Sequence, residues 1–229
     1  MNYMIYTPGE VVDLKKVITD EKYATDNNLI VRQMKDLFIM KYNKKYIKYD
    51  NIATLGLFRS IVCNLDGKIL SFAPPKSTRF DEFSQQTKYE NCDFYEFIEG
   101  TMINLFWDTT IKDWNIATRS NIGGRCKFDQ DSKLTFRHMF LEAMNNTKLE
   151  FSMLDKQYCY SFTMQHPKNR IVVPIVEPDL FLVAKYVIND DNTIEQVNFS
   201  ENDKAICKTP NKLKAIENSW NDFIEYVMS

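Results

Sequence analysis

The spacing of apolar residues predicts helices toward both ends of the chain. Apolar positions recur at helical spacing over 11–18 and 29–40. A third helix is expected over 135–145, with Thr135 near its start as a candidate N-cap. A fourth is expected over 211–228, where one apolar stripe consists of Leu213, Ile216, Trp220, Phe223, Ile224 and Val227. Such a stripe is more typical of core packing than of a partner site.

Between these helices, short apolar runs predict strands. Asp66-Gly67 separates the runs 57–63 and 68–72, and Asp-Gly between two apolar runs is typical of a β-hairpin turn. Further strands are expected over 94–97, 101–107, 114–118, 158–164, 170–176 and 180–188. The sequence therefore predicts an α+β fold built on antiparallel sheets with flanking helices. We expect one domain over 1–229, with an N-terminal helical and basic segment (1–48), core strands (49–190) and a C-terminal helical segment (191–229).

The composition is that of an ordinary globular protein with one basic stretch. The chain has 229 residues, is 44% hydrophobic and carries a formal net charge of -2, which excludes a wholly basic nucleic-acid coat. Within 32–48, aromatic residues are interleaved with Arg32, Lys35, Lys41, Lys44, Lys45 and Lys48, against one acid, Asp36. Two interpretations remain open, a solvated amphipathic element or a surface that contacts a phosphate backbone.

Cysteine usage and hydropathy indicate a reducing, non-membrane setting. The five cysteines are odd in number, widely spaced and part of no short motif, so neither a disulfide framework nor a zinc site is predicted. No apolar run approaches the roughly 18 residues that a membrane span needs, and the N-terminus lacks a signal-peptide pattern. We expect a cytoplasmic protein without a membrane partner, and the abundance of Lys, Asn and Ile is typical of an AT-rich genome such as a viral one.

Several charged residues lie beside strand-like runs and suit phosphate binding. Two prolines precede Lys76 and hold its backbone extended, so that the lysine is presented from a stiff arm. Arg59 and Arg119 offer planar guanidinium groups that bind phosphate with two hydrogen bonds. Glu99 supplies a carboxylate for a ribose hydroxyl or a metal ion, and Gly100 allows close backbone approach. Together these residues predict a nucleotide-binding site.

Five segments follow one another in a recognisable order: Phe-Arg-Ser at 58–60, Ala-Pro-Pro-Lys-Ser at 73–77, Phe-Ile-Glu-Gly-Thr at 97–101, Ala-Thr-Arg-Ser at 117–120, and Phe-Thr-Met-Gln-His-Pro-Lys-Asn-Arg-Ile-Val at 162–172. This order resembles the nucleotidyltransferase domain of phage-type RNA ligases, in the covalent nucleotidyltransferase superfamily with DNA ligases and mRNA capping enzymes. The resemblance covers roughly residues 50 to 190, and its most specific part is the last segment.

The resemblance implies a ligase-type reaction. In it a lysine attacks the α-phosphate of ATP, and the AMP carried on that lysine passes to a 5′-phosphate end, which a 3′-hydroxyl then attacks. It implies ATP and Mg²⁺ as cofactors and RNA ends as partners, with Glu99 as a candidate metal ligand.

The sequence also departs from the family pattern. Phe97 stands where the family carries its nucleophilic lysine, and Thr163 where it usually carries a glutamate. Two later family motifs would be expected after the helix ending near Val227, whereas the sequence stops at Ser229. We therefore expect either a second polypeptide or domain that supplies those motifs, or a relative that has lost the chemistry.

Three hypotheses follow from this pattern. The first is an active nucleotidyltransferase that uses Lys76 as nucleophile. The second is a nucleotide- or RNA-binding relative without covalent chemistry. The third is a structural or partner-binding protein that keeps only the fold. The joint presence of Arg59, Lys76, Glu99 and Arg119 speaks against the third, because maintaining a fold has little use for buried charge.

Overall fold

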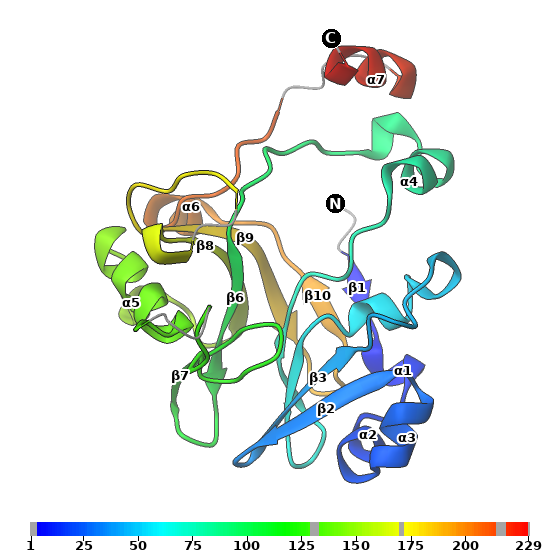
Figure 1. Cartoon of the computed structure of the whole chain (residues 1–229), viewed down its shortest axis with the longest axis vertical. Coiled ribbons are helices and arrows are strands. Elements are labelled where there is room, and N and C mark those ends of the chain that lie inside the picture. The colour runs from blue at the N-terminus through cyan, green and yellow to red at the C-terminus, as the bar shows by residue number, and fades with distance from the viewer. Residues whose placement is uncertain (1–3, 129–132, 170–171, 214–218, 229) are drawn as a thin grey trace. The chain divides into compact units, whose positions relative to one another are not determined.

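Two antiparallel sheets form the larger of two structural units (Figure 1). The computed structural model describes residues 4–128, 133–169, 172–213 and 219–228. Contacts divide the chain into a first unit, residues 1–76 with 99–209, and a second unit, residues 77–98 with 210–229. Both secondary-structure types are present and the strands pair antiparallel, so the predicted α+β class is confirmed.

The larger sheet has six strands in the described residues, in the order β1-β10-β9-β8-β6-β7. These strands are β1 (Ile5–Tyr6), β10 (Ile194–Gln196), β9 (Asp179–Ile188), β8 (Tyr158–Gln165), β6 (Thr101–Asp108) and β7 (Asp113–Ala117). The second sheet runs in chain order through β2 (Leu29–Met34), β3 (Leu37–Tyr42), β4 (Ile61–Asn64) and β5 (Ile69–Phe72). The hairpin predicted around Asp66-Gly67 is therefore confirmed, and the strands predicted over 101–107 and 114–118 pair with each other as β6 and β7.

Helices of the first unit come in two groups. One precedes the second sheet in the sequence: α1 (Pro8–Val11), α2 (Leu14–Thr19) and α3 (Glu21–Asp26). The other consists of α5 (Phe136–Asn146), which contacts β8 and β9, and α6 (Glu201–Ile206). Thr135 caps α5, because its hydroxyl accepts the backbone N–H of His138 at 3.3 Å. Short 3₁₀ helices occur at Tyr49–Asn51, Leu55–Leu57, Tyr89–Asn91, Phe151–Met153 and Pro167–Asn169.

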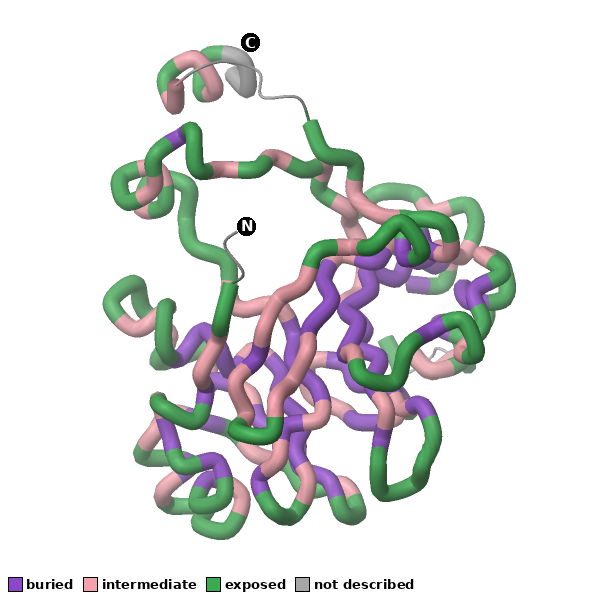
Figure 2. Tube along the Cα trace, turned by 180° about the vertical axis from the view of Figure 1, so that it is seen from behind, coloured by how far each residue is buried: buried purple, intermediate pink, exposed green. Residues whose placement is uncertain are grey.

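The core of the first unit lies along the strands, as the buried segments in Figure 2 show. Between the two sheets, the Phe72 ring meets the Tyr186 ring edge-on at 5.1 Å, and the Ser71 hydroxyl lies 3.5 Å from the Cys159 thiol. Beneath α5, Phe140 contacts Phe162 with ring centroids 6.0 Å apart. All five cysteines are described and none forms a disulfide.

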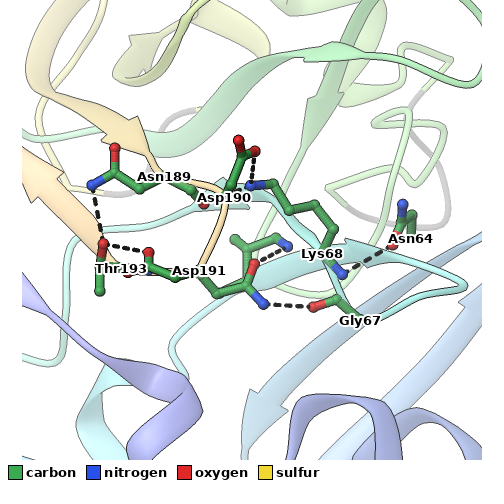
Figure 3. A network of polar contacts seen from close by, with 9 residues as sticks. Asn64, Gly67, Lys68, Asn189, Asp190, Asp191 and Thr193 are labelled. Atoms are coloured by element: carbon green, nitrogen blue, oxygen red, sulfur yellow. Dashed lines mark hydrogen bonds and ion pairs between the residues drawn. The ribbon is translucent and has the colours of Figure 1, made fainter.

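Two turns also join the sheets through polar contacts (Figure 3). Lys68, after the β4–β5 turn, forms an ion pair with Asp190 at 2.9 Å and donates to the carbonyl oxygen of Asn189. Asn192, in the β9–β10 turn, accepts the backbone N–H of Ile69 at 2.8 Å and donates to the Gly67 carbonyl at 3.1 Å. These contacts fix how one sheet lies against the other.

The second unit is built around Trp220 and contains α4 (Phe80–Gln86) and α7 (Trp220–Met228). The indole N–H of Trp220 donates to the Thr87 carbonyl at 2.9 Å. The Trp220 ring contacts the rings of Phe80, Phe83 and Tyr89. Trp220 and Phe223, both in the predicted C-terminal stripe, therefore contact the aromatic side chains of this unit. Among the described residues, no helix combines the length and apolarity that crossing a bilayer requires.

Three predicted elements were wrong in the residues that the structure describes. Residues 29–40 form β2 and part of β3 rather than a helix, because the Lys35-Asp36 turn, with Lys35 at a φ of 58°, divides the run into two paired strands. Residues 94–97 form no strand apart from a bridge between Tyr95 and Lys212, and residues 172–176 are irregular. Arg170 and Ile171 lie outside the described residues. The expected helix over 211–228 begins, as described, only at Trp220.

Candidate functional site

A pocket of about 320 Å³ opens beside the start of β6 and the end of β7. It brings together Arg59 and Arg119, the two arginines that the sequence predicts for phosphate binding. None of the described lining residues is acidic, and most of the polar ones can donate a hydrogen bond: the lining consists of Arg59, Ser60, Ala73, Thr101, Met102, Asn104, Thr118, Arg119, Ser120 and Phe136. The pocket is therefore suited to an anion.

Two turns hold the arginines in place. Arg119 follows β7, in a turn where the Thr118 N–H donates to the Asn121 carbonyl at 2.9 Å. Arg59 precedes β4 in the second sheet. The Ser60 hydroxyl donates to the Thr118 carbonyl at 3.2 Å, so that the turn carrying Arg59 is attached to the turn carrying Arg119. The two cations thus come from different sheets but belong to one rigid site.

The guanidinium of Arg119 has unsatisfied hydrogen-bond donors. Its Cζ lies 4.8 Å from the centroid of the Tyr42 ring, a cation–π arrangement. Its Nε and Nη2 atoms are buried and have no hydrogen-bond partner within the described residues. A buried donor without a partner costs on the order of 1–3 kcal/mol, and more when it is charged. An anionic ligand in the pocket would remove that cost.

Lys41 adds a second cation beside Arg119. It lies on β3, and its ammonium donates to the Ser120 hydroxyl at 2.5 Å. Burial lowers the pKa of Lys41 below its ordinary value of 10.5, and the positive charges of Arg119, Arg32 and Lys44 lower it further. Positive charge is thus concentrated at this edge of the pocket without a compensating carboxylate among the described residues.

Asn104 contributes a further donor. It lies opposite Ser161 in the β6–β8 ladder, and its Oδ1 accepts the Ser161 hydroxyl at 2.8 Å. Its Nδ2 is buried and has no partner in the described part of the chain. In the sequence Lys41 stands out only as one member of a basic stretch, and Asn104 was not predicted. A polar side chain inside an apolar run, as in Met-Ile-Asn-Leu-Phe, is the signal that identifies Asn104.

Glu99 lies near β6 but does not line the pocket. Its carboxylate accepts the backbone N–H groups of Val172 at 2.7 Å and Val173 at 3.1 Å, and its carbonyl accepts from the Gln165 side chain. These bonds hold the segment after β8. Its predicted role as a ligand for ribose or metal stays a prediction.

The magnesium ion that the resemblance implies stays a prediction. Mg²⁺ prefers carboxylate and other oxygen ligands, and within the described chain no group of three His, Cys, Asp or Glu side chains could hold a metal. The pocket itself is lined by donors and cations.

Gly100 is required by strand packing. Its φ is 156°, and an added Cβ would lie 2.5 Å from the Met164 carbonyl oxygen and 2.7 Å from the Thr163 methyl group. Both neighbours are fixed by the β6–β8 ladder. We expect Gly100→Ala to destabilise the protein by about 1–3 kcal/mol in urea unfolding, because the backbone must move to relieve the overlap. Gly9→Ala is the control, since a Cβ there meets no atom within 4 Å, and an equal loss in both variants would contradict this account.

Lys76 is held by its backbone against a neighbouring turn. Its N–H donates to the Gly56 carbonyl at 3.0 Å, and its Cβ would lie 3.3 Å from a Cβ placed on Gly56. Lys76 is not among the residues that line the pocket. Its predicted role as nucleophile and nucleotide ligand stays a prediction.

At the position of the family nucleophile, the Phe97 side chain is 91% exposed, and a phenyl ring forms no bond to phosphorus. Thr163 is buried on β8. Asn169, in the last resembling segment, donates to the Thr101 hydroxyl at 2.6 Å. The segment thus lies beside β6, while Arg170, its next residue, falls outside the described residues.

Comparison with known proteins supports the family resemblance. An RNA ligase of Rhodothermus phage RM378 is 24% identical to this chain over 202 residues, which take in 72% of this chain and 44% of the ligase. This chain is a distant homologue of that phage RNA ligase. This similarity agrees with the resemblance to ligase-type nucleotidyltransferases that the five segments indicate. The chain spans less than half the length of this curated relative.

The other two comparisons add little. No protein-family model matches the sequence. A solved chain from Aquifex aeolicus, described as a candidate ATP-dependent DNA ligase, superposes with a TM-score of 0.49 at 13% sequence identity. That superposition covers 91% of this chain and 54% of the Aquifex chain.

Proposed function

We propose that this ligase-type domain binds the phosphates of ATP in the pocket between Arg59 and Arg119 without forming a lysyl adduct at position 97. The observation that carries the proposal is the pair of buried donor atoms Nε and Nη2 of Arg119, which have no partner within the described residues. Phosphate oxygens are suitable acceptors, because guanidinium binds them with two parallel hydrogen bonds. The homologous phage protein is an RNA ligase, which supports a nucleotide over other anions.

The neighbouring residues would bind and orient the phosphates. Lys41 and Arg59 supply further positive charge, and Asn104 supplies an unpaired amide donor. Because these groups extend from strands and from turns fixed by hydrogen bonds, little reorganisation is needed when the anion arrives. Magnesium, where it takes part, would be coordinated chiefly by the nucleotide phosphates themselves.

Covalent transfer is the second candidate function, and it depends on another lysine. Phe97 forms no phosphoramidate, so a transferase would need Lys76 or a different amine as nucleophile. The specific observation in its favour is the fixed backbone of Lys76, which the Gly56 carbonyl holds. In that case the domain would carry AMP toward RNA ends, as the resemblance implies.

One experiment separates these functions. The purified chain is titrated calorimetrically with ATP and with GTP, and in parallel incubated with α-³²P-labelled ATP and magnesium before a denaturing gel. We expect ATP binding and no label after denaturation. A label that survives denaturation and disappears in Lys76→Ala would establish covalent transfer instead. Absence of binding by either nucleotide would overturn the proposed function.

A further inference from the structure

A basic loop, residues 43–49, runs from the end of β3 into the first 3₁₀ helix (Tyr49–Asn51) and follows Lys41 closely in the sequence. Lys44, Lys45, Tyr46, Lys48 and Tyr49 are all exposed, with 50% of Tyr46 and 46% of Tyr49 accessible. Lys44 lowers the pKa of Lys41, so its charge acts on the pocket edge. The loop therefore extends the positive charge of the pocket onto the surface.

The loop backbone is held by hydrogen bonds. The Tyr46 N–H donates to the Asn43 carbonyl at 3.0 Å, and the Lys45 N–H to the Asn43 side chain at 3.1 Å. Asn51 then closes the other end, because its side chain accepts the Lys48 N–H at 2.8 Å and donates to the Tyr46 carbonyl at 2.9 Å. The lysines and tyrosines are thus displayed from a fixed framework, which lowers the entropy cost of binding.

Positive charge predominates in the loop, whose three lysines are followed by one acidic residue, Asp50, in the first 3₁₀ helix. None of the three lysines forms an ion pair with any described residue. Since the protein as a whole has a formal charge of -2, this positive region is local.

We propose that the basic loop binds single-stranded nucleic acid, with its lysines on the phosphates and its tyrosines against unpaired bases. Alternation of lysine and exposed tyrosine fits this partner, because a single strand offers both a charged backbone and free base faces, whereas in a duplex the bases are stacked on each other. Positive charge continues from Lys44 to Lys41 and Arg119. This charge would attract the terminal phosphate of a bound strand toward the pocket. This last step rests on the proposed function of the pocket.

The test compares two double variants of equal charge change. Fluorescence anisotropy measures binding of 5′-phosphorylated RNA and DNA 20-mers, single-stranded and duplex, across a range of salt concentrations. We expect Lys44→Ala/Lys45→Ala to weaken single-strand binding and to reduce the slope of log K against log salt by about 1.4, as two lost phosphate contacts predict. Lys15→Ala/Lys22→Ala, which removes two exposed lysines from α2 and α3, should bind as the wild type does.

A single substitution probes the stacking. Tyr46→Ala should weaken single-strand binding roughly 5- to 100-fold without changing the salt slope, because it removes a base contact and no charge. Equal weakening by both double variants, or equal affinity for duplex and single strand, would overturn the proposal.

Binding of ATP, measured by the melting temperature, tests the pocket independently of the loop. ATP should raise the melting temperature of the Tyr46→Ala variant as it does that of the wild type, because Tyr46 carries no charge and does not line the pocket. If ATP binds to no variant while the oligonucleotide result holds, the proposed pocket function fails and the loop proposal stands.

Discussion

Replacing Arg119 by methionine is expected to weaken ATP binding by at least about 100-fold. The two buried donors, Nε and Nη2, would each give a charge-assisted hydrogen bond to phosphate of about 1.5–3 kcal/mol, and two such bonds correspond to that factor. Methionine keeps most of the side-chain volume and removes the charge. Calorimetric titration of both proteins with ATP measures the difference.

The unliganded protein should respond in the opposite direction. Because Arg119 buries donors that no described residue satisfies, its removal should leave the apo melting temperature unchanged or raised. Arg125→Met is the matched control, since Arg125 is exposed and does not line this pocket, and it should retain full ATP affinity. If Arg119→Met lowers the stability of the unliganded protein and leaves the ATP affinity intact, the guanidinium stabilises the fold, and the proposal that it binds ATP is wrong.

Removal of the Asp203 carboxylate is expected to cost about 3–5 kcal/mol of stability. Asp203 at the start of α6 forms a buried ion pair with Lys185 on β9, and each side chain is at most 7% exposed. Its carboxylate also accepts the Ser200 N–H and hydroxyl, both at 2.7 Å. Asp203→Ala leaves the Lys185 ammonium buried without its counter-ion, which accounts for the size of the loss.

Urea unfolding measures this loss, and a second substitution tests its cause. Lys185→Met/Asp203→Ala removes both charges and should recover part of the stability that Asp203→Ala loses. If the double variant is less stable than Asp203→Ala, the stranded ammonium is not the source of the penalty.

The ion pair of Asp203 with Lys185 also makes the free energy of unfolding depend on pH in the acidic range. Burial alone would raise the pKa of Asp203, but hydrogen bonds from Lys185 and Ser200 outweigh it and lower the pKa below its ordinary value of 3.8. The folded protein therefore binds the proton less readily than the unfolded chain does. The contribution of Asp203 is complete above about pH 4 and is lost as the pH falls through the lowered pKa. The stability gap between wild type and Asp203→Ala should narrow in that range.

Local sequence signals predicted much of the fold. Asp66-Gly67 predicted the β4–β5 hairpin, and Thr135 predicted the start of α5, because turns and caps depend on side chains only a few residues apart. The helix predicted over residues 29–40 was wrong because their apolar positions suit both a helix and a buried strand. The pairing of β3 with β4 decides between the two, and that pairing is tertiary.

The candidate site, too, could be predicted only where local sequence patterns determine it. The order of the motifs predicted Arg59 and Arg119, which line one pocket. Lys41 joins them only because β3 brings its ammonium to the Ser120 hydroxyl, a partner that is remote in sequence. The bonds from Glu99 to Val172 and Val173 are equally remote, so no local pattern indicated that this carboxylate was already engaged.

The second unit has a consequence for the order of folding during synthesis. Residues 77–98 and 210–229 form it together, and residues 99–209 of the first unit lie between them in the chain. Phe80, Phe83 and Tyr89 leave the ribosome long before Trp220, the ring around which they gather. Translation therefore delivers every strand of both sheets before the second unit can close, and until then its aromatic side chains lack their central partner.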